Sequence, residues 1–197
     1  PDEITIGGES AGAFSVCNMV AMPTTDGLFH RAIAQSGAAH HTFGPDDGKE
    51  IAGEFLGRLG DPSADELMTM DVGAILEAQE LVAADRSHLP GRNQEPFYPV
   101  WGHEALPRDP RELIAEGAGA DVAMLTGTNE DELALWGVTE MSATKLDDMV
   151  GAITNNPSNM LATYRHRLDE GETGWLACAI GTDRVFRIPA VRLADAR

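Results

Sequence analysis

The stretch that decides the fold is Ile4-Thr5-Ile6-Gly7-Gly8-Glu9-Ser10-Ala11-Gly12. Its first three residues are β-branched and typical of a strand, and the glycine pair that follows interrupts this run. An alanine-rich amphipathic segment then continues to about Met22, with apolar residues at helical spacing. The sequence therefore predicts a strand, a tight turn and a helix in immediate succession.

Within that turn, Gly8-Glu9-Ser10-Ala11-Gly12 matches the Gly-x-Ser-x-Gly pattern of a nucleophile elbow, a sharp strand-to-helix bend with serine at its apex. We expect glycine at positions 8 and 12 because a Cβ at either flank would collide with the neighbouring strand or helix. The Ser10 hydroxyl then stands at the carboxyl end of the sheet, and the Ala11 amide can point at a developing oxyanion. A turn serine without a chemical role is the alternative interpretation.

Two further strands are predicted. Residues 31–35, Arg-Ala-Ile-Ala-Gln, are a second strand candidate that ends at Ser36-Gly37, and together with the first unit they predict a βαβ unit with parallel strands. Residues 122–126 are predicted to be a buried strand that leads into the acidic run Glu130-Asp131-Glu132. This order predicts an α/β fold with a mostly parallel sheet flanked by helices. Working residues of such folds follow strand ends, but spacing alone does not choose among the three acids.

The rest of the chain has the pattern of helices joined by loops. A first helix is predicted over residues 45–59, with a stop at Gly60; a second begins at a capping box at 63–66, and a third runs from Asp71 to about 86. Further helices are predicted over residues 111–116, 142–150, 159–168 and 175–197. The last of these is expected to have a kink or break at Pro189. Residues 87–110 are predicted to be an irregular connection, with Phe97, Tyr98, Val100 and Trp101 pinned to the body of the protein.

Composition limits the classes of partner. The chain has 197 residues and a formal net charge of -18, with lysine only at Lys49 and Lys145, so nucleic acid and anionic membrane surfaces are not expected to bind. No apolar run is long enough to cross a bilayer, and no leader segment is recognised. Cys17 and Cys178 lie in apolar helical patterns and are expected to be buried thiols, which leaves the cellular compartment open. We expect one domain over residues 1–197.

The motifs together resemble the type B carboxylesterase family, which includes the cholinesterases. The resemblance covers nearly the whole chain and rests on residues 4–13, 27–37, 97–102 with Leu106-Pro107, 125–132, and Asp183, Phe186 and Pro189. It implies an α/β-hydrolase fold, incomplete here because the N-terminal strands and the C-terminal part are not recognised, and it implies hydrolysis of small-molecule carboxylic esters without a cofactor.

Matched residue by residue, the resemblance implies that Ser10 is the nucleophile, Ala11 supplies one oxyanion-hole amide, and Glu132 is the triad acid. It gives Ser36 the place of a small buried hydroxyl near the triad, although a plain strand-end cap fits as well. The sequence departs from the family pattern at three places. It has Gly7 where the family usually has a bulky residue, and Leu133 where the family often has a glycine after the acid. It also has Trp101 before Gly102, where an aspartate before the glycine is common in the family. These departures concern packing and pocket shape rather than a triad group.

A base for the serine is not recognised. A hydroxyl needs a neighbouring base, and the family order places a histidine after the acid, where His166 is the sole candidate. His166 lacks the flanking glycine of the family pattern and is expected at the surface of a helix, and the other histidines, at 30, 40, 41, 88 and 103, are expected to be polar loop residues. The pair His40-His41 lacks nearby cysteine and does not predict a metal site.

These observations favour an ester hydrolase that works through an acyl-serine intermediate. The second oxyanion-hole loop is also not recognised, so the remainder of the same esterase chain is expected as a partner and residues 1–197 alone are expected to be inactive. Two rivals stay open: a non-catalytic, adhesion-type relative that uses the fold as a binding surface, and a structural α/β domain in which the elbow is a coincidence.

Overall fold

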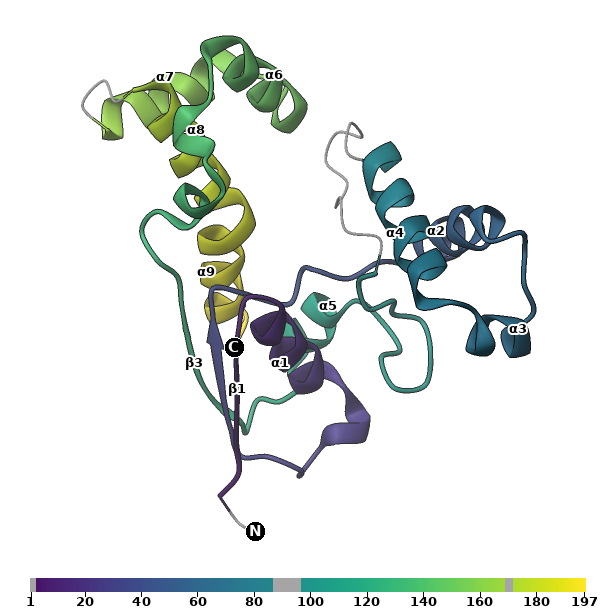
Figure 1. The fold of residues 1–197 in the computed structure, drawn as a ribbon. Helices are drawn as coiled ribbons and strands as arrows, with labels where there is room; N and C mark the ends of the chain where they lie inside the picture. The colour runs from purple at the N-terminus through teal and green to yellow at the C-terminus, as the bar shows by residue number, and fades with distance from the viewer. Residues whose placement is uncertain (1–2, 87–96, 169–171) are drawn as a thin grey trace. The chain divides into compact units, whose positions relative to one another are not determined.

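The computed structural model describes residues 3–86, 97–168 and 172–197 of the chain. Its contacts divide the chain into two compact units, each with its own packing: a larger unit made of residues 1–40 and 104–197, and a smaller unit made of residues 41–103 (Figure 1). The larger unit contains the sheet and the serine bend, so it is described first.

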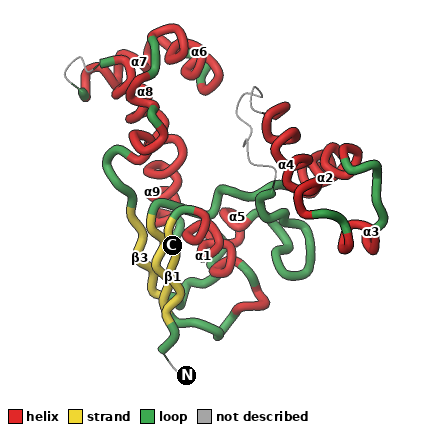
Figure 2. Tube along the Cα trace, viewed as in Figure 1, coloured by secondary structure: helices red, strands yellow, loops and turns green. Residues whose placement is uncertain are grey.

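The sheet has three strands, β1 (Thr5–Glu9), β2 (Arg31–Gln35) and β3 (Ala123–Gly127), all parallel and in the order β1-β2-β3 (Figure 2). The predicted second strand is confirmed at its bounds. The first strand is longer than its β-branched run, because the glycine pair stays in the ladder, with Gly8 opposite Ala34.

One face of the sheet is covered and the other is open. Helix α1 (Ala11–Ala21) packs on β1 and β2, and Ala32 and Ala34 of β2 are fully buried. On the opposite face Arg31 and Gln35 are exposed, and Leu125 of β3 keeps 66% of its surface exposed. The prediction that β3 is buried is therefore wrong for this face, because an apolar parallel strand is buried on both sides only where helices cover both faces.

Short elements connect the sheet to its helices. A 3₁₀ turn, η1 (Pro23–Thr25), follows α1, and helix α5 (Pro110–Ala115) precedes β3. After β3 come two 3₁₀ turns, η2 (Glu132–Trp136) and η3 (Val138–Glu140).

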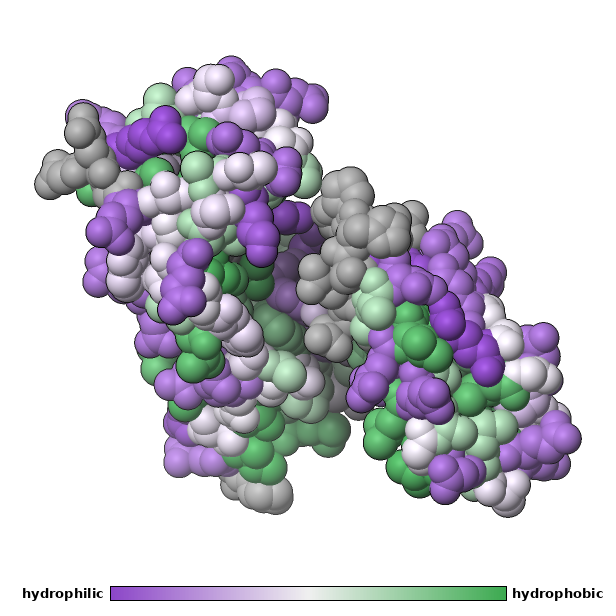
Figure 3. Space-filling view, turned by 45° about the horizontal axis from the view of Figure 1, so that its top comes forward, coloured by the Kyte–Doolittle hydropathy of each residue, from purple (hydrophilic) through white to green (hydrophobic). Residues whose placement is uncertain are grey.

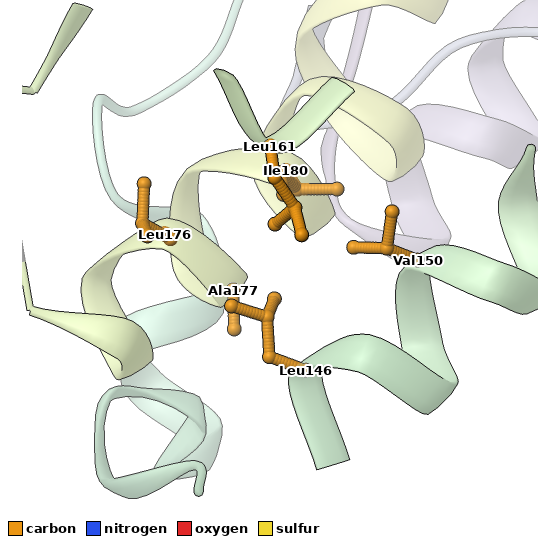
Figure 4. Packing of buried hydrophobic residues seen from close by; sticks show 6 residues of the cluster. All are labelled: Leu146, Val150, Leu161, Leu176, Ala177 and Ile180. Atoms are coloured by element: carbon orange, nitrogen blue, oxygen red, sulfur yellow. The ribbon is translucent and has the colours of Figure 1, made fainter. Parts of the chain in front are cut away.

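A helical cluster follows these turns. Helices α6 (Ala143–Ile153), α7 (Pro157–Arg167) and α8 (Thr173–Thr182) confirm the helices predicted there and enclose one apolar core. The buried members of this core, seen in Figure 4, are Leu146, Val150, Leu161, Leu176, Ala177 and Ile180. At ~1.5–3 kcal/mol for each large aliphatic side chain, their burial is the main force that holds the three helices together.

The last helical run changes its hydrogen-bonding pattern without breaking. Helix α8 passes into a π-helical turn, η4 (Asp183–Arg187), and then into α9 (Ile188–Asp195), which packs near β3 (Figure 1). The predicted break at Pro189 is replaced by this wider turn. Because Pro189 has no N–H to donate, it fits the first turn of α9, and the irregularity lies just before it.

The smaller unit is built from α2 (Pro45–Arg58), α3 (Ala64–Thr69) and α4 (Val72–Arg86). The capping box is confirmed, since the Ser63 N–H donates to the Glu66 carboxylate at 2.8 Å and the Ser63 hydroxyl accepts the Glu66 N–H. Phe55 packs with Ala78 and Val82, and the Phe97 ring meets the Phe55 ring edge-on.

The apolar residues of the irregular segment pack within this smaller unit. Val100 pairs with Phe43 in a single bridge, and the Tyr98 ring contacts both Phe43 and His41. The expected pinning of these residues is therefore confirmed for the smaller unit, while residues 87–96 of the predicted irregular connection lie outside the described residues.

The surface is mixed in polarity. The face drawn in Figure 3 shows apolar side chains reaching the surface on both units, and the exposed apolar residues include Met68, Leu125, Leu135 and Trp136. Within residues 3–86, 97–168 and 172–197, none of the helices combines the length and the apolar character that a bilayer crossing requires.

Candidate functional site

Ser10 occupies the bend between β1 and α1. Its backbone has φ 53° and ψ -118°, a positive φ that non-glycine residues rarely adopt. The Ser10 N–H donates to the Gln35 carbonyl of β2 at 2.9 Å, and the Ser10 carbonyl accepts the Phe14 N–H at 3.0 Å. These two bonds hold the bend in place, and the Ser10 side chain is partly exposed at the end of the sheet.

The two glycines of the motif are not equivalent. A Cβ built on Gly8 would lie 2.3 Å from the backbone carbon of Gly12, which no relaxation of side chains can relieve. A Cβ on Gly12 would meet no described atom within 4 Å. The expectation that both flanks exclude a side chain is therefore correct for Gly8 and wrong for Gly12, because α1 leaves the sheet with its second glycine facing outward.

Ala11 and Glu9 flank the serine. Ala11 is the first residue of α1, so its N–H belongs to the group of helix-start amides that have no acceptor within the helix. The Ala11 side chain is exposed and too small to screen that amide. Glu9 ends β1 with an exposed side chain.

Ser36 lies in a second bend, at the end of β2. It has φ 55°, keeps 5% of its surface exposed, and its N–H donates to the Gly127 carbonyl of β3 at 2.8 Å. The strand-end position is confirmed. The bond also ties the end of β2 to the end of β3, so the turns after all three strands lie along one edge of the sheet.

Glu132 begins η2, in the turn after β3. Its carboxylate accepts the Asn129 N–H at 2.8 Å and the Asn129 side-chain amide at 3.2 Å. Glu132 is partly buried, whereas Glu130 and Asp131 are exposed. The structure thus separates the three acids that spacing could not separate.

These turns border a cavity of about 370 Å³ at the carboxyl edge of the sheet. Its walls include Glu9 and Ser36 from the first two strand ends, and Thr128 and Asn129 from the turn that carries Glu132. The cavity lies at the carboxyl edge of the parallel sheet, which is where α/β folds bind ligands. Ser10 and Glu132 are not among the residues that line it: they follow the two outer strands, β1 and β3, and each is adjacent in sequence to a turn that borders the cavity.

The histidines are distributed over the larger and smaller units. His166 is exposed on α7, as expected, and His103 is exposed in a loop. The His30 ring accepts the Ile4 N–H at 3.3 Å, at the amino end of the sheet, and His88 lies outside the described residues. No cluster of three or more metal-ligating side chains occurs in the described part of the chain.

His40 and His41 are not exposed loop residues. His41 keeps 8% of its surface exposed, and the His40 ring packs edge-on against Phe14 of α1. The pKa of His40 is lowered from 6.5 to about 4, chiefly by burial and to a smaller extent by the Arg111 guanidinium, while a bond to the Val185 carbonyl opposes both effects. The predicted loop positions are confirmed, since neither residue lies in a helix or strand, but contacts with Phe14 and Tyr98 leave His40 only partly exposed and His41 buried.

The depressed pKa of His40 makes the folding of the larger unit dependent on pH. The unfolded chain binds a proton at His40 near pH 6.5 whereas the folded chain does not until about pH 4. We expect the unfolding free energy contributed by His40 to be complete above pH 6.5 and to fall by about 3 kcal/mol as the pH drops to 4.

Urea unfolding of the wild type and of His40→Gln at a series of pH values measures this contribution as the difference between two pH profiles. The control His166→Gln, at an exposed histidine, should keep the wild-type profile. Identical profiles for the wild type and His40→Gln would refute the assignment.

The two cysteines are buried free thiols, as expected. Burial raises the pKa of Cys17 to about 12 and also raises the pKa of Cys178. A thiol with a raised pKa forms little of the nucleophilic thiolate, so neither cysteine competes with Ser10 as a candidate nucleophile.

Sequence reasoning missed the residues that support the Glu132 turn. The Leu133 N–H donates to the Thr182 hydroxyl at 3.3 Å, and Arg187 donates to the Glu130 carbonyl at 2.7 Å. Asp183 pairs with Arg187 across one turn of η4. The single signal in the sequence is the four-residue spacing of Asp183 and Arg187, which by itself indicates an ordinary helix pair.

Comparison with known proteins gives one consistent result. A family model described as "Carboxylesterase family" matches residues 1–187. Para-nitrobenzyl esterase of Bacillus subtilis (strain 168) is 31% identical over 204 residues, which cover 100% of this chain and 40% of that protein. Human cocaine esterase is 35% identical over 144 residues, which cover 67% of this chain and 23% of that protein.

Solved structures agree with these sequence relatives. A crystal structure of a Geobacillus stearothermophilus carboxylesterase matches with a TM-score of 0.77 and 30% identity, over 100% of this chain and 41% of that chain. A structure described as a thermophilic PNB esterase matches with a TM-score of 0.76, 30% identity and 40% coverage of its chain. The present chain spans about 40% of the length of these full-coverage relatives.

Proposed function

Because this chain belongs to the carboxylesterase family, we propose that it is the part of a carboxylic ester hydrolase that carries the nucleophile and the triad acid. Ser10 is the nucleophile, Ala11 contributes an oxyanion-hole amide, and Glu132 is the acid. The fold on which these groups sit is that of the α/β-hydrolase carboxylesterases.

The proposed reaction has two halves. The Ser10 oxygen attacks the ester carbonyl carbon while a base takes its proton, and the Ala11 N–H donates to the resulting oxyanion. The tetrahedral intermediate then expels the alcohol, which receives that proton, and leaves an acyl-serine. Water attacks the acyl carbon by the same route and releases the carboxylic acid and free Ser10.

Glu132 acts on the base rather than on the ester in this scheme. A carboxylate bonded to an imidazole holds it in the tautomer that accepts a proton from serine, and it stabilises the imidazolium that forms. The two bonds from Asn129 fix the Glu132 carboxylate in one orientation, which supports this role. The base is proposed to be a histidine supplied by the remainder of the same esterase chain.

The observation that carries the proposal is the Ser10 bend. A serine held at φ 53° between a strand and a helix, with a glycine behind it that cannot be replaced, is a strained arrangement that a plain turn does not need. The open face of the sheet supports a larger enzyme, and so do the outer edges of β1 and β3, which pair with no other strand among the described residues, since such surfaces in parallel sheets are normally covered.

Fluorophosphonate labelling of the complete enzyme tests the proposal. The phosphorus reagent reacts with an activated serine, so we expect a covalent label on the peptide that contains Ser10 and complete loss of labelling in Ser10→Ala. Ser15→Ala is the matched control, because Ser15 is an exposed serine of α1, the helix that follows Ser10, and its hydroxyl donates to the Ala11 carbonyl at 2.9 Å. Its labelling should equal that of the wild type.

A folded complete enzyme that takes no label would contradict the hydrolase and favour the non-catalytic binding relative. Labelling that persists in Ser10→Ala would place the nucleophile elsewhere.

A further inference from the structure

We propose that Arg187 is a positioning residue for Glu132: from η4 it holds the turn that carries the acid, and it is itself aligned by Asp183 and Tyr164. The inference rests on the proposed function, because it concerns the acid of that reaction. Arg187 does not bind substrate in this proposal; it acts through the backbone of the turn.

Arg187 donates to two consecutive carbonyls of the turn. Its Nη2 lies 2.7 Å from the Glu130 carbonyl oxygen and 3.5 Å from that of Asn129. A guanidinium is planar and always charged, so it can hold two acceptors at a fixed separation, which a flexible ammonium cannot. The turn is thereby tied to a residue that lies 57 positions away in the sequence.

The Arg187 guanidinium is itself held in place by neighbouring side chains. Its Nη1 pairs with the Asp183 carboxylate, and the other oxygen of that carboxylate accepts the Tyr164 hydroxyl at 2.7 Å. Asp183 keeps 6% of its surface exposed, so this carboxylate is stable in place only because it is paired. Tyr164 comes from α7, which packs on α8, so the pair is anchored in the helical core.

Hydrogen bonds within the turn connect the residues held by Arg187 to the Glu132 carboxylate. Asn129, whose carbonyl is the second acceptor of Arg187, donates both its N–H and its side-chain amide to the Glu132 carboxylate. On the other side of Glu132, the Leu133 N–H is held by Thr182 at 3.3 Å. The end of α8 and the π-helical turn therefore hold the acid from both sides.

The expected effect of losing this support is on the rate of the chemical step. A misplacement of a catalytic group by about 1 Å can cost about 100-fold in rate. Because the turn would keep the bond from Thr182 to Leu133, we expect the Glu132 carboxylate to move by less than this distance. We therefore expect Arg187→Gln to lower kcat by about 10-fold and to leave KM within about 2-fold, because no substrate contact is removed.

Three variants of the complete enzyme separate positioning from mere folding. Arg187→Gln removes the charge and the planar fork, whereas Arg187→Lys keeps the charge and can reach one carbonyl, so it should recover part of kcat. Arg184→Gln is the matched control, since Arg184 is an exposed arginine of the same turn, and its kcat should be that of the wild type.

Hydrogen exchange of the backbone amides at Asn129 and Leu133 measures how often the turn opens, and it does not depend on enzymatic activity. We expect faster exchange at both amides in Arg187→Gln and wild-type exchange in Arg184→Gln, with the core amides of Leu176 and Ile180 unchanged in both.

The outcomes are distinguishable from failure of the proposed function. If the wild type neither hydrolyses esters nor takes the fluorophosphonate, the function fails, yet the exchange data still decide whether Arg187 holds the turn. If esters are hydrolysed and Arg187→Gln has wild-type kcat and wild-type exchange, the positioning role is overturned. A rise in KM with unchanged kcat would also overturn it, because that pattern indicates a substrate contact.

Discussion

Replacing Glu132 with glutamine is expected to lower kcat of the complete enzyme by about 10⁴-fold while the protein stays folded. An amide has nearly the shape of a carboxylate and can keep a bond from Asn129, so the turn should survive. It carries no charge, however, and it can hold the proposed histidine in the tautomer that cannot accept the serine proton. Steady-state hydrolysis of a chromogenic ester, with circular dichroism as a check on folding, measures the loss.

The neighbouring acids supply the controls for this experiment. Glu130 and Asp131 are exposed, and in the proposed reaction neither faces the base, so Glu130→Gln and Asp131→Asn should keep kcat within about 2-fold of the wild type. A loss of the same size in either control, with little effect of Glu132→Gln, would mean that the acid has been assigned to the wrong residue.

Gly8→Ala is expected to have the largest effect on stability, a loss of about 4 kcal/mol in unfolding free energy or failure to fold. The added Cβ would stand 2.3 Å from the Gly12 carbon, 2.4 Å from the Gly12 oxygen and 2.8 Å from the Ala13 nitrogen. All three are backbone atoms, so α1 would have to move away from β1 to make room. Urea or thermal unfolding of the chain measures the change.

Gly12→Ala is the matched control because it adds the same methyl group to the same motif. With no described atom within 4 Å of the added Cβ, and with alanine favoured over glycine in a helix by up to about 1 kcal/mol, the variant should be as stable as the wild type or slightly more stable. Equal destabilisation by the two variants would show that the serine bend is not held by the close approach at Gly8.

The individual strands, bends and helix starts could be predicted because the sequence pattern for each lies within a few adjacent residues. The strand, bend and helix around Ser10 and the bounds of β2 follow from short-range preferences, and so does the capping box at Ser63. The prediction that glycine is required at position 8 is confirmed. The same prediction for position 12 is wrong, because whether a helix residue meets another segment depends on tertiary packing.

The rest depends on contacts between residues far apart in the sequence. The exposure of Leu125 depends on which face of the sheet the helices cover, and the partial burial of His40 depends on its contact with Phe14 of α1. The bonds from Thr182 and Arg187 to the turn that carries Glu132 span 49 and 57 positions in the sequence, so local periodicity does not indicate them. The family resemblance reached Glu132 by motif, and the structure adds what fixes it.

The parallel pairing of β2 with β3 also has a consequence for synthesis of the chain. Arg31 pairs with Ala123, and the whole smaller unit is encoded between them. On the ribosome, therefore, that edge of β2 has no partner until the codons for β3 are read, on the order of 10 s later at usual elongation rates. The smaller unit leaves the exit tunnel first, and its own apolar core can form during that wait.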